Sequence, residues 1–196
     1  MNDSNILDIP MIHSELESKS KEINFTMPSD LYIGTLLKTL VASKPKGRFL
    51  ELGTGIGLSL SWIIDGMDSK SELISIDNDP ELISIAKNFF DTDERAKLLC
   101  QDGADWIDRN ENQKFDLIFA DAWPGKYAGI EKILDMVKVG GFYIIDDMSV
   151  QLNWPDGHQD HVDNLTDYLE QRKDYTITKL NWSTGLIIAV KKNIRD

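Results

Sequence analysis

Cysteine is almost absent from this sequence: Cys100 is the one example in 196 residues, so no disulfide can form within the chain. Such scarcity is typical of proteins from reducing compartments. Because Cys100 ends an apolar run, we expect a buried packing residue rather than a nucleophile. No run approaches the roughly 18 apolar residues that span a membrane, and Met1 to Ser4 show no basic start of a secretory signal. We therefore expect a soluble, cytoplasmic protein.

Basic side chains are outnumbered, with 21 Lys and Arg against 33 Asp and Glu and a formal net charge of −12. Binding to phosphate backbones depends on Lys and Arg, so we expect no nucleic-acid partner, and no membrane partner either. Repeats and linkers rich in Gly, Ser or Pro are also lacking. We expect one domain over residues 27–196, preceded by a loosely held arm, residues 1–26, with a short helix around Ser14 to Glu22.

Short apolar runs alternate with helical patterns through most of the chain. Strands are predicted at Arg48–Leu52, Leu73–Ile76, Lys97–Cys100, Phe115–Ala120, Phe142–Ile145, Tyr175–Leu180 and Gly185–Lys191. Helices are predicted at Leu58–Asp65, Pro80–Phe90, Ala104–Arg109, Tyr127–Val137 and Gln159–Arg172. This alternation predicts an α/β fold with a mostly parallel sheet and helices on both faces. The last two strands are separated by four residues, Asn181 to Thr184, so they must form an antiparallel hairpin.

Two helix starts carry specific signals. Ser29 follows Pro28 and is the expected N-cap of a helix that Pro45 stops. Asp79 precedes Pro80 and is the expected N-cap of the next clear helix. The face of that second helix is predicted from its helical spacing to consist of Leu82, Ile85, Ala86 and Phe89.

Three glycines, Gly53, Gly55 and Gly57, follow the first predicted strand and precede a helix. Glycine permits a sharp turn and lets a ligand approach the main chain. Leu58 stands where a dinucleotide-binding fingerprint has its last glycine. The turn therefore indicates an adenosyl ligand other than NAD, although a tight turn without any ligand has the same spacing.

Carboxylates follow four successive predicted strands, at Asp77, Asp102, Asp121 and the pair Asp146 and Asp147. Each one alone could be a helix cap or a solvated turn residue. Because ligands of such sheets bind at the carboxyl ends of the strands, the set as a whole favours a polar site there.

The chain resembles class I S-adenosylmethionine-dependent methyltransferases, and more narrowly the catechol and caffeoyl-CoA type O-methyltransferases. The likeness covers about Met27 to Lys192. It is carried by five segments: Met27 to Gly34, Leu50 to Ser59, Ile76-Asp77, Asp121 to Tyr127, and Gly140-Gly141 to Asp146-Asp147. The resemblance implies a Rossmann-like fold with a seven-stranded sheet, S-adenosylmethionine as cofactor and transfer of its methyl group, most directly to an oxygen of a small molecule.

The resemblance also implies a set of cofactor contacts. Glu51 would face the ammonium of the cofactor's amino-acid end, Asp77 both ribose hydroxyls, and Asp102 the adenine amino group. Trp123 would pack near the adenine or the sulfonium, or else cover the sheet edge. The full set is Glu51, Gly53, Thr54, Gly55, Gly57, Ser59, Asp77, Asn78, Gln101, Asp102, Gly103, Asp121 and Trp123.

At the catalytic end the sequence departs from the resembled family. Metal-dependent members place Asp, Asp and Asn where this chain has Asp121, Asp146 and Asp147, which would hold Mg²⁺ or Ca²⁺ if a cation binds. Pro124 replaces the family lysine, and Lys126, two positions later, either acts as a base or points to solvent. His158, three residues before His161, is a second candidate base or an ordinary surface histidine. The predicted catalytic residues are Asp121, Lys126 and His158.

Two alternatives remain open at this stage. One is a methyltransferase-like module that binds the cofactor without turnover, which the replacement by Pro124 and the short arm would allow. The other is an NAD-dependent oxidoreductase, which the glycine spacing and the terminal hairpin oppose. Relatives often dimerise, so a homodimer is a possible state. The sequence does not identify the methyl acceptor.

Overall fold

The computed structural model describes residues 2–151 and 154–193. These residues divide into two compact units, Met1–Asp102 and Gly103–Asp196, which we take in turn. Within the described residues no helix is long and apolar enough to cross a membrane.

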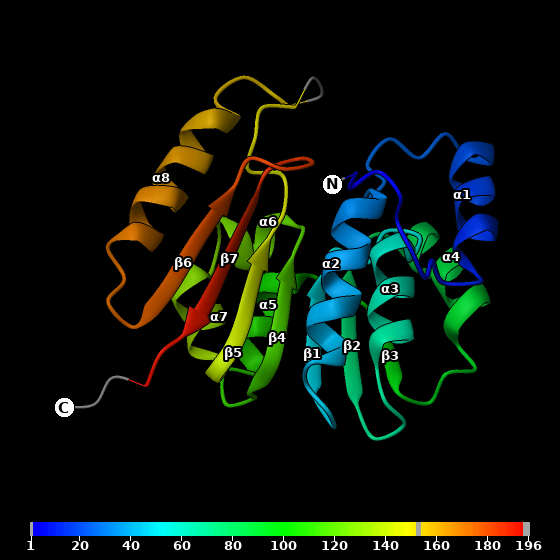
Figure 1. Cartoon of the computed structure of the whole chain (residues 1–196), viewed down its shortest axis with the longest axis horizontal. Coiled ribbons are helices and arrows are strands. Elements are labelled where there is room, and N and C mark those ends of the chain that lie inside the picture. The colour runs from blue at the N-terminus through cyan, green and yellow to red at the C-terminus, as the bar shows by residue number, and fades with distance from the viewer. Residues whose placement is uncertain (1, 152–153, 194–196) are drawn as a thin grey trace. The chain divides into compact units, whose positions relative to one another are not determined.

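The first unit contains three parallel strands in the order β3-β2-β1. Its elements are α1 (His13–Glu22), α2 (Leu31–Ala42), β1 (Arg48–Leu52), α3 (Leu58–Gly66), β2 (Glu72–Asp77), α4 (Pro80–Phe90) and β3 (Ala96–Cys100). The strands are in parallel register, with Leu52 opposite Ile76 and Asp77 opposite Cys100. Helices α2 and α3 lie side by side (Figure 1).

The second unit has the strand order β4-β5-β7-β6. Its elements are α5 (Gly103–Arg109), β4 (Phe115–Ala120), α6 (Trp123–Lys126), α7 (Ile130–Asp135), β5 (Val137–Ile145), α8 (His158–Glu170), β6 (Tyr175–Leu180) and β7 (Leu186–Lys191). Strands β4 and β5 are parallel, whereas β7 is antiparallel to both β5 and β6. The predicted C-terminal hairpin is therefore confirmed.

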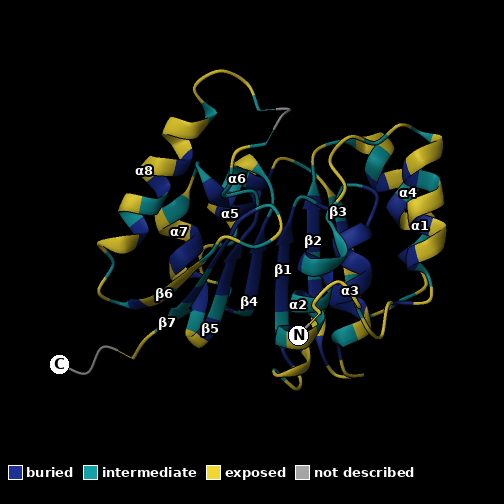
Figure 2. Ribbon diagram, turned by 45° about the horizontal axis from the view of Figure 1, so that its top comes forward, coloured by how far each residue is buried: buried dark blue, intermediate teal, exposed yellow. Residues whose placement is uncertain are grey.

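Buried apolar residues line the strands of both units, dark blue in Figure 2. In the first unit, Phe49 and Leu50 of β1 and Trp62 of α3 are almost fully buried. In the second, Phe119 of β4 and Ile144 of β5 are fully buried. Each such side chain stabilises the fold by roughly 1.5–3 kcal/mol through removal from water. Because both faces of these strands are covered, apolar residues occupy successive positions in them, and the strand segments of the sequence are continuous apolar runs.

The predicted arm is packed rather than loosely held. Leu16 of α1 is fully buried, and the His13 ring meets the Trp62 ring edge-on at a centroid distance of 5.4 Å. The His13 imidazole also lies 3.4 Å from the hydroxyl of Ser61, both distances being to residues of α3. The sequence did not predict this packing because the buried face of α1 contains a single apolar residue, Leu16, beside His13 and Ser20.

Two features at helix ends and faces differ from the predictions. Asp30, not Ser29, is the N-cap of α2, because its carboxylate accepts the Ile33 N–H at 3.0 Å. Asp79 does cap α4, as predicted, through the N–H groups of Glu81 and Leu82. The buried face of α4 is Ile83, Ala86 and Phe90, whereas Leu82, Ile85 and Phe89 are half-buried.

The predicted helix Tyr127–Val137 is confirmed only over Ile130–Asp135, and both of its ends are wrong. Gly129 has a φ of 75° and starts the short helix α7, which ends at Asp135. Val137 then begins β5, which is longer than the predicted Phe142–Ile145 and contains a register shift opposite Phe115 and Leu117. Cys100, predicted to be buried, is exposed at the end of β3, because this strand is the edge of its unit.

Candidate functional site

The glycine turn between β1 and α3 adopts the conformation that the sequence predicts. Gly53, Gly55 and Gly57 have φ values of 103°, 52° and 98°, in the left-handed region that favours glycine. A Cβ at Gly57 would lie 2.6 Å from Cε2 of Phe90, so the close approach also requires glycine. Gly57 is the N-cap of α3 and supplies no side chain to its first N–H groups. These groups are suited to an anionic ligand group such as a carboxylate.

Glu51 lies at the end of β1 and is fully buried. Its two carboxylate oxygens accept hydrogen bonds from the hydroxyls of Ser59, at 2.7 Å, and Ser75. The Ser75 hydroxyl also contacts the Thr54 hydroxyl at 2.6 Å. Burial raises the pKa of Glu51 to about 7, against the opposing effect of the two hydroxyl donors. The predicted role of Glu51 toward a cofactor ammonium stays a prediction.

Ser75 was not among the predicted site residues. It joins Glu51 and Thr54 beneath the turn, and it is fully buried between Ile74 and Ile76. The sequence does contain a signal for Ser75. It is a polar residue in an apolar strand covered on both faces, and such a buried residue requires a hydrogen-bond partner.

Asp77 is brought to the glycine turn, as the sequence suggested. Its Oδ2 accepts the Gly55 N–H at 2.9 Å, and its Oδ1 accepts the Asp79 N–H at 3.0 Å. The Gln101 N–H donates to the main-chain carbonyl of Asp77 at 3.0 Å, so the end of β3 lies beside it. Asp77 and Gln101 are half-buried, whereas Asn78 and Asp102 are exposed. Gly103 is the first residue of α5 in the other unit.

In the second unit, Lys126 lies inside a polar cluster at the ends of β4 and β5. The side chain is 4% exposed, and its ammonium donates to the main-chain carbonyl of Asp146 at 2.6 Å and of Asp147 at 3.4 Å. Burial lowers the pKa of Lys126, while the charges of Asp121, Asp147 and Asp146 oppose this effect. Of the two predicted orientations, solvent exposure is therefore wrong, and a role as base remains untested.

Asp146 is also buried, with 3% of its surface exposed. Its Oδ1 accepts the Asp147 N–H at 2.7 Å and the Thr184 hydroxyl. Burial raises the pKa of Asp146 to about 7, helped by the nearby charge of Asp147. Asp147 itself has a φ of 53°, a left-handed conformation that is uncommon for residues other than glycine. Thr184 is a second site neighbour that the sequence did not indicate.

These residues do not fit a divalent cation. Among the described residues no group of three or more Asp, Glu, His or Cys side chains is arranged to hold a metal ion. Oδ1 of Asp146 is engaged by the Thr184 hydroxyl and the Asp147 N–H, and the charge of the Lys126 ammonium already acts on Asp121, Asp146 and Asp147. A hard cation needs several oxygens directed at one point.

An aromatic group surrounds the other predicted base. His158 Nε2 lies 3.2 Å from the Tyr127 hydroxyl, and its ring lies 4.4 Å from that of Trp154. Trp123, 48% exposed, packs on Tyr127 and His161, each with a centroid distance of 4.8 Å. Burial lowers the pKa of His158, and the positive charges of Lys126 and His161 add to this. The imidazole is thus neutral near pH 7 and able to accept a proton.

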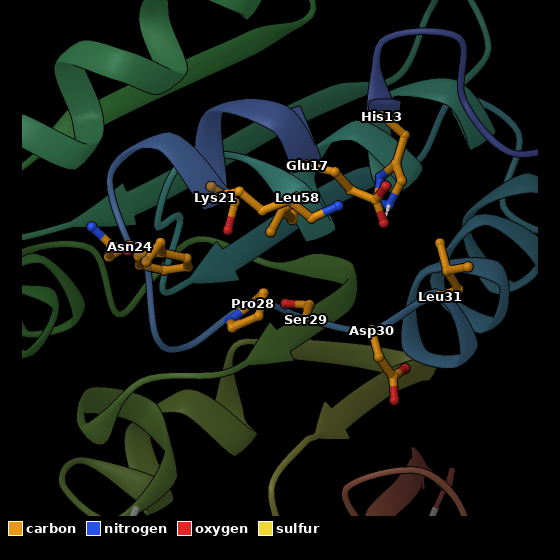
Figure 3. Close-up of a pocket in the computed structure, with 11 residues that line it drawn as sticks. His13, Glu17, Lys21, Asn24, Pro28, Ser29, Asp30, Leu31 and Leu58 are labelled. Atoms are coloured by element: carbon orange, nitrogen blue, oxygen red, sulfur yellow. Dashed lines mark ion pairs between the residues drawn. The ribbon is translucent and has the colours of Figure 1, made fainter. Parts of the chain in front are cut away.

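A pocket of about 490 Å³ opens next to the glycine turn of the first unit (Figure 3). Its lining residues are His13, Glu17, Ser20, Lys21, Asn24, Phe25, Pro28, Ser29, Asp30, Leu31 and Leu58. Leu58 directly follows Gly57, and a Cβ at Gly55 would lie 3.1 Å from Cζ of Phe25. Figure 3 shows the ion pair between His13 and Glu17, 3.8 Å long, at one end. The N-terminal segment thus forms a wall beside the turn.

Similarity to known proteins covers nearly the whole chain. A family model described as O-methyltransferase matches residues 8–185. A protein of Mycobacterium leprae with a provisional O-methyltransferase name is 33% identical over 96 residues, which make up 47% of this chain and 43% of that protein. The matched stretch thus spans less than half the length of this relative.

Two solved structures resemble the chain along almost all of its length. An O-methyltransferase from Bacillus cereus, solved in complex with SAH, has a TM-score of 0.83 and 20% identity, covering 96% of this chain and 94% of that one. TomG from Streptomyces achromogenes, solved with SAM and involved in tomaymycin synthesis, has a TM-score of 0.80 and 20% identity, covering 97% and 93%. The predicted fold class, a mostly parallel seven-stranded sheet with a C-terminal antiparallel hairpin, is confirmed.

Proposed function

The chain belongs to the O-methyltransferase family, and from that premise we propose that it transfers a methyl group from S-adenosylmethionine to an oxygen of a small molecule. The observation that carries the proposal is the contact between Asp77 and the glycine turn. Gly55 donates its N–H to Asp77 at 2.9 Å, so a carboxylate and an uncapped helix start lie together at one strand end. An adenosyl ligand with a carboxylate tail needs both.

The residues present fit this cofactor. The first N–H groups of α3 would take its carboxylate, and Asp77 would accept from its ribose hydroxyls. When bound, S-adenosylmethionine supplies an electrophilic methyl group: its sulfur–carbon bond breaks as the acceptor's oxygen–carbon bond forms, and the acceptor hydroxyl loses its proton. The remaining predicted contacts, from Glu51 to Trp123, belong to the same proposal.

His158 is the proposed acceptor of that proton. Its imidazole is neutral near pH 7, and the contact with the Tyr127 hydroxyl fixes the orientation of the ring. Asp121, at the end of β4, and Lys126 are the other two proposed catalytic residues, Asp121 through its charge. The catalytic contribution of such positioned groups is alignment and electrostatic stabilisation.

Calorimetry with S-adenosylmethionine and S-adenosylhomocysteine tests the cofactor directly. We expect both to bind, and we expect Asp77→Ala to weaken binding about 5- to 150-fold, because ribose donors worth roughly 1–3 kcal/mol lose their acceptor. Glu81→Ala is the matched control, since this carboxylate is exposed on α4, four residues away. Absence of binding by either compound would refute the proposal.

The acceptor is proposed only by class, as a small molecule with a nucleophilic hydroxyl. A screen of such compounds that detects release of S-adenosylhomocysteine distinguishes turnover from mere cofactor binding. A homodimer also stays a proposal, which sedimentation of the purified chain would test.

A further inference from the structure

The ends of β4 and β5 carry three carboxylates and one buried amine. Lys126 interacts electrostatically with Asp121, Asp146 and Asp147, and its ammonium is 2.6 Å from the carbonyl oxygen of Asp146. The ammonium also lies 3.4 Å from the carbonyl oxygen of Asp147 and 5.1 Å from the centroid of the Tyr127 ring. In the described part of the chain, the positively charged group of this cluster is thus the ammonium of Lys126.

The local backbone aims Lys126 inward. Pro124 and Gly125 leave the helical conformation inside α6, with a ψ of 136° at Pro124 and a φ of 81° at Gly125. The buried hydroxyl of Tyr143 donates to the carbonyl of Gly125 and fixes this turn against β5. Because a lysine stem is flexible and entropically costly to order, such a fixed turn is what keeps the ammonium buried.

We propose that the Lys126 ammonium is the resident cation of this cluster and replaces a divalent metal ion there. An ammonium held against the main-chain carbonyls of Asp146 and Asp147, within electrostatic reach of the Asp121, Asp146 and Asp147 carboxylates, offsets part of their charge and repels a second cation. Oδ1 of Asp146 accepts from the Thr184 hydroxyl and the Asp147 N–H, which fixes the orientation of this carboxyl. The part of the site that would receive the methyl acceptor, at the ends of β4 and β5, then needs no Mg²⁺ or Ca²⁺. A catalytic role of Lys126 in this cluster rests on the proposed function, whereas the exclusion of a metal ion does not.

Manganese provides a probe that needs neither cofactor nor turnover. Mn²⁺ is titrated into the full chain after chelator treatment, and the free ion is followed by electron paramagnetic resonance. We expect the unmodified chain to show no stoichiometric binding. Lys126→Met, which keeps the stem and removes the charge, is expected to bind Mn²⁺ at least tenfold more tightly, because the ammonium no longer repels the ion and the three carboxylates can reorient toward it.

Two controls separate this effect from general changes. Lys126→Arg keeps the charge, and Lys138→Met removes a half-exposed lysine that pairs with Asp116 at 2.7 Å, elsewhere on β5. Both are expected to behave like the unmodified chain. Circular dichroism monitors folding of each variant, and the measurement on the unmodified chain depends on no variant.

Either of two results would overturn the proposal. One is binding of a single Mn²⁺ by the unmodified chain that Asp121→Asn abolishes. The other is a folded Lys126→Met variant that binds Mn²⁺ no better than its parent. Failure of the proposed function would be visible separately, as a loss of S-adenosylhomocysteine binding in the calorimetric experiment.

Discussion

Glu51 combines complete burial with a carboxyl group whose pKa is raised to about 7. In an unfolded chain the same group titrates near 4.5. The folded state therefore holds the proton more tightly, so stability from this group is present at low pH and is lost as pH rises from about 4.5 through 7. The loss is about 3 kcal/mol in order of magnitude, because one pKa unit corresponds to about 1.4 kcal/mol.

Glu51→Gln removes this titration while keeping a side chain that can bond Ser59 and Ser75. Urea unfolding at pH 5.5 and pH 8 is expected to show a smaller loss of stability in the variant than in the parent, with weaker cofactor binding. Glu72→Gln is the control, because this glutamate of β2 is exposed and pairs with Arg48 at the surface. Equal pH slopes for parent and Glu51→Gln would contradict the pKa assignment.

His158 gives a kinetic prediction at the same scale. If the imidazole accepts the acceptor's proton, His158→Gln should reduce kcat by about 10²–10⁴-fold. Because the pKa of His158 is lowered by burial, activity of the parent should persist below pH 6.5, and its acid limb should vanish in the variant. His161→Gln is the matched control, since it alters the same aromatic group. A pH–rate profile unchanged by His158→Gln would exclude the role.

Residues of the site were predictable where one position carried its own signal. The glycines, Asp77 and the strand-end carboxylates follow from spacing alone. Thr184 could not be found in this way, because it reaches Asp146 from the turn between β6 and β7, 38 positions along the chain. The burial of Lys126 depends likewise on a kinked turn and on Tyr143, which no local pattern reveals.

At the scale of elements, the strands were predicted well, and of the two predicted N-caps Asp79 is right whereas Ser29 is replaced by Asp30. Helix α4 begins at Pro80 as expected because Asp79 and Pro80 are both local start signals. The helix predicted over 127–137 is too long at both ends, because Gly129 starts α7 and the pairing of Val137 with Phe115 begins β5. Pairing with a distant strand overrides local propensity.

The junction of the glycine turn with α3 offers a paired test of strain and space. Gly57→Ala should destabilise the chain by about 2–4 kcal/mol, because it places a Cβ at a φ of 98° and 2.6 Å from Phe90. In Gly140→Ala, in β5, the added Cβ has no neighbouring atom within 4 Å, so only the backbone strain remains. This variant should be destabilised by about 1–2 kcal/mol. Urea unfolding measures both. Equal losses would mean that Phe90 gives way and that the close approach is unimportant.

For the whole molecule, a ligand that binds only the folded chain must stabilise it by mass action. S-adenosylhomocysteine at 100 times its Kd should add about 2.7 kcal/mol to the free energy of unfolding. For a chain of 196 residues this corresponds to a rise in Tm of roughly 5–10 °C.

The same thermal experiment connects the cofactor site to the fold as a whole. Asp77→Ala should lose from about a third to nearly all of the rise at equal ligand concentration, for a roughly 5- to 150-fold weaker Kd, whereas Lys126→Met should keep it, because its charge belongs to the acceptor end. Saturating ligand should restore the rise in Asp77→Ala, since linkage depends on the ratio of concentration to Kd. A rise that no concentration restores would mean that Asp77 maintains the turn itself, through its bond to the Gly55 N–H, rather than the ribose.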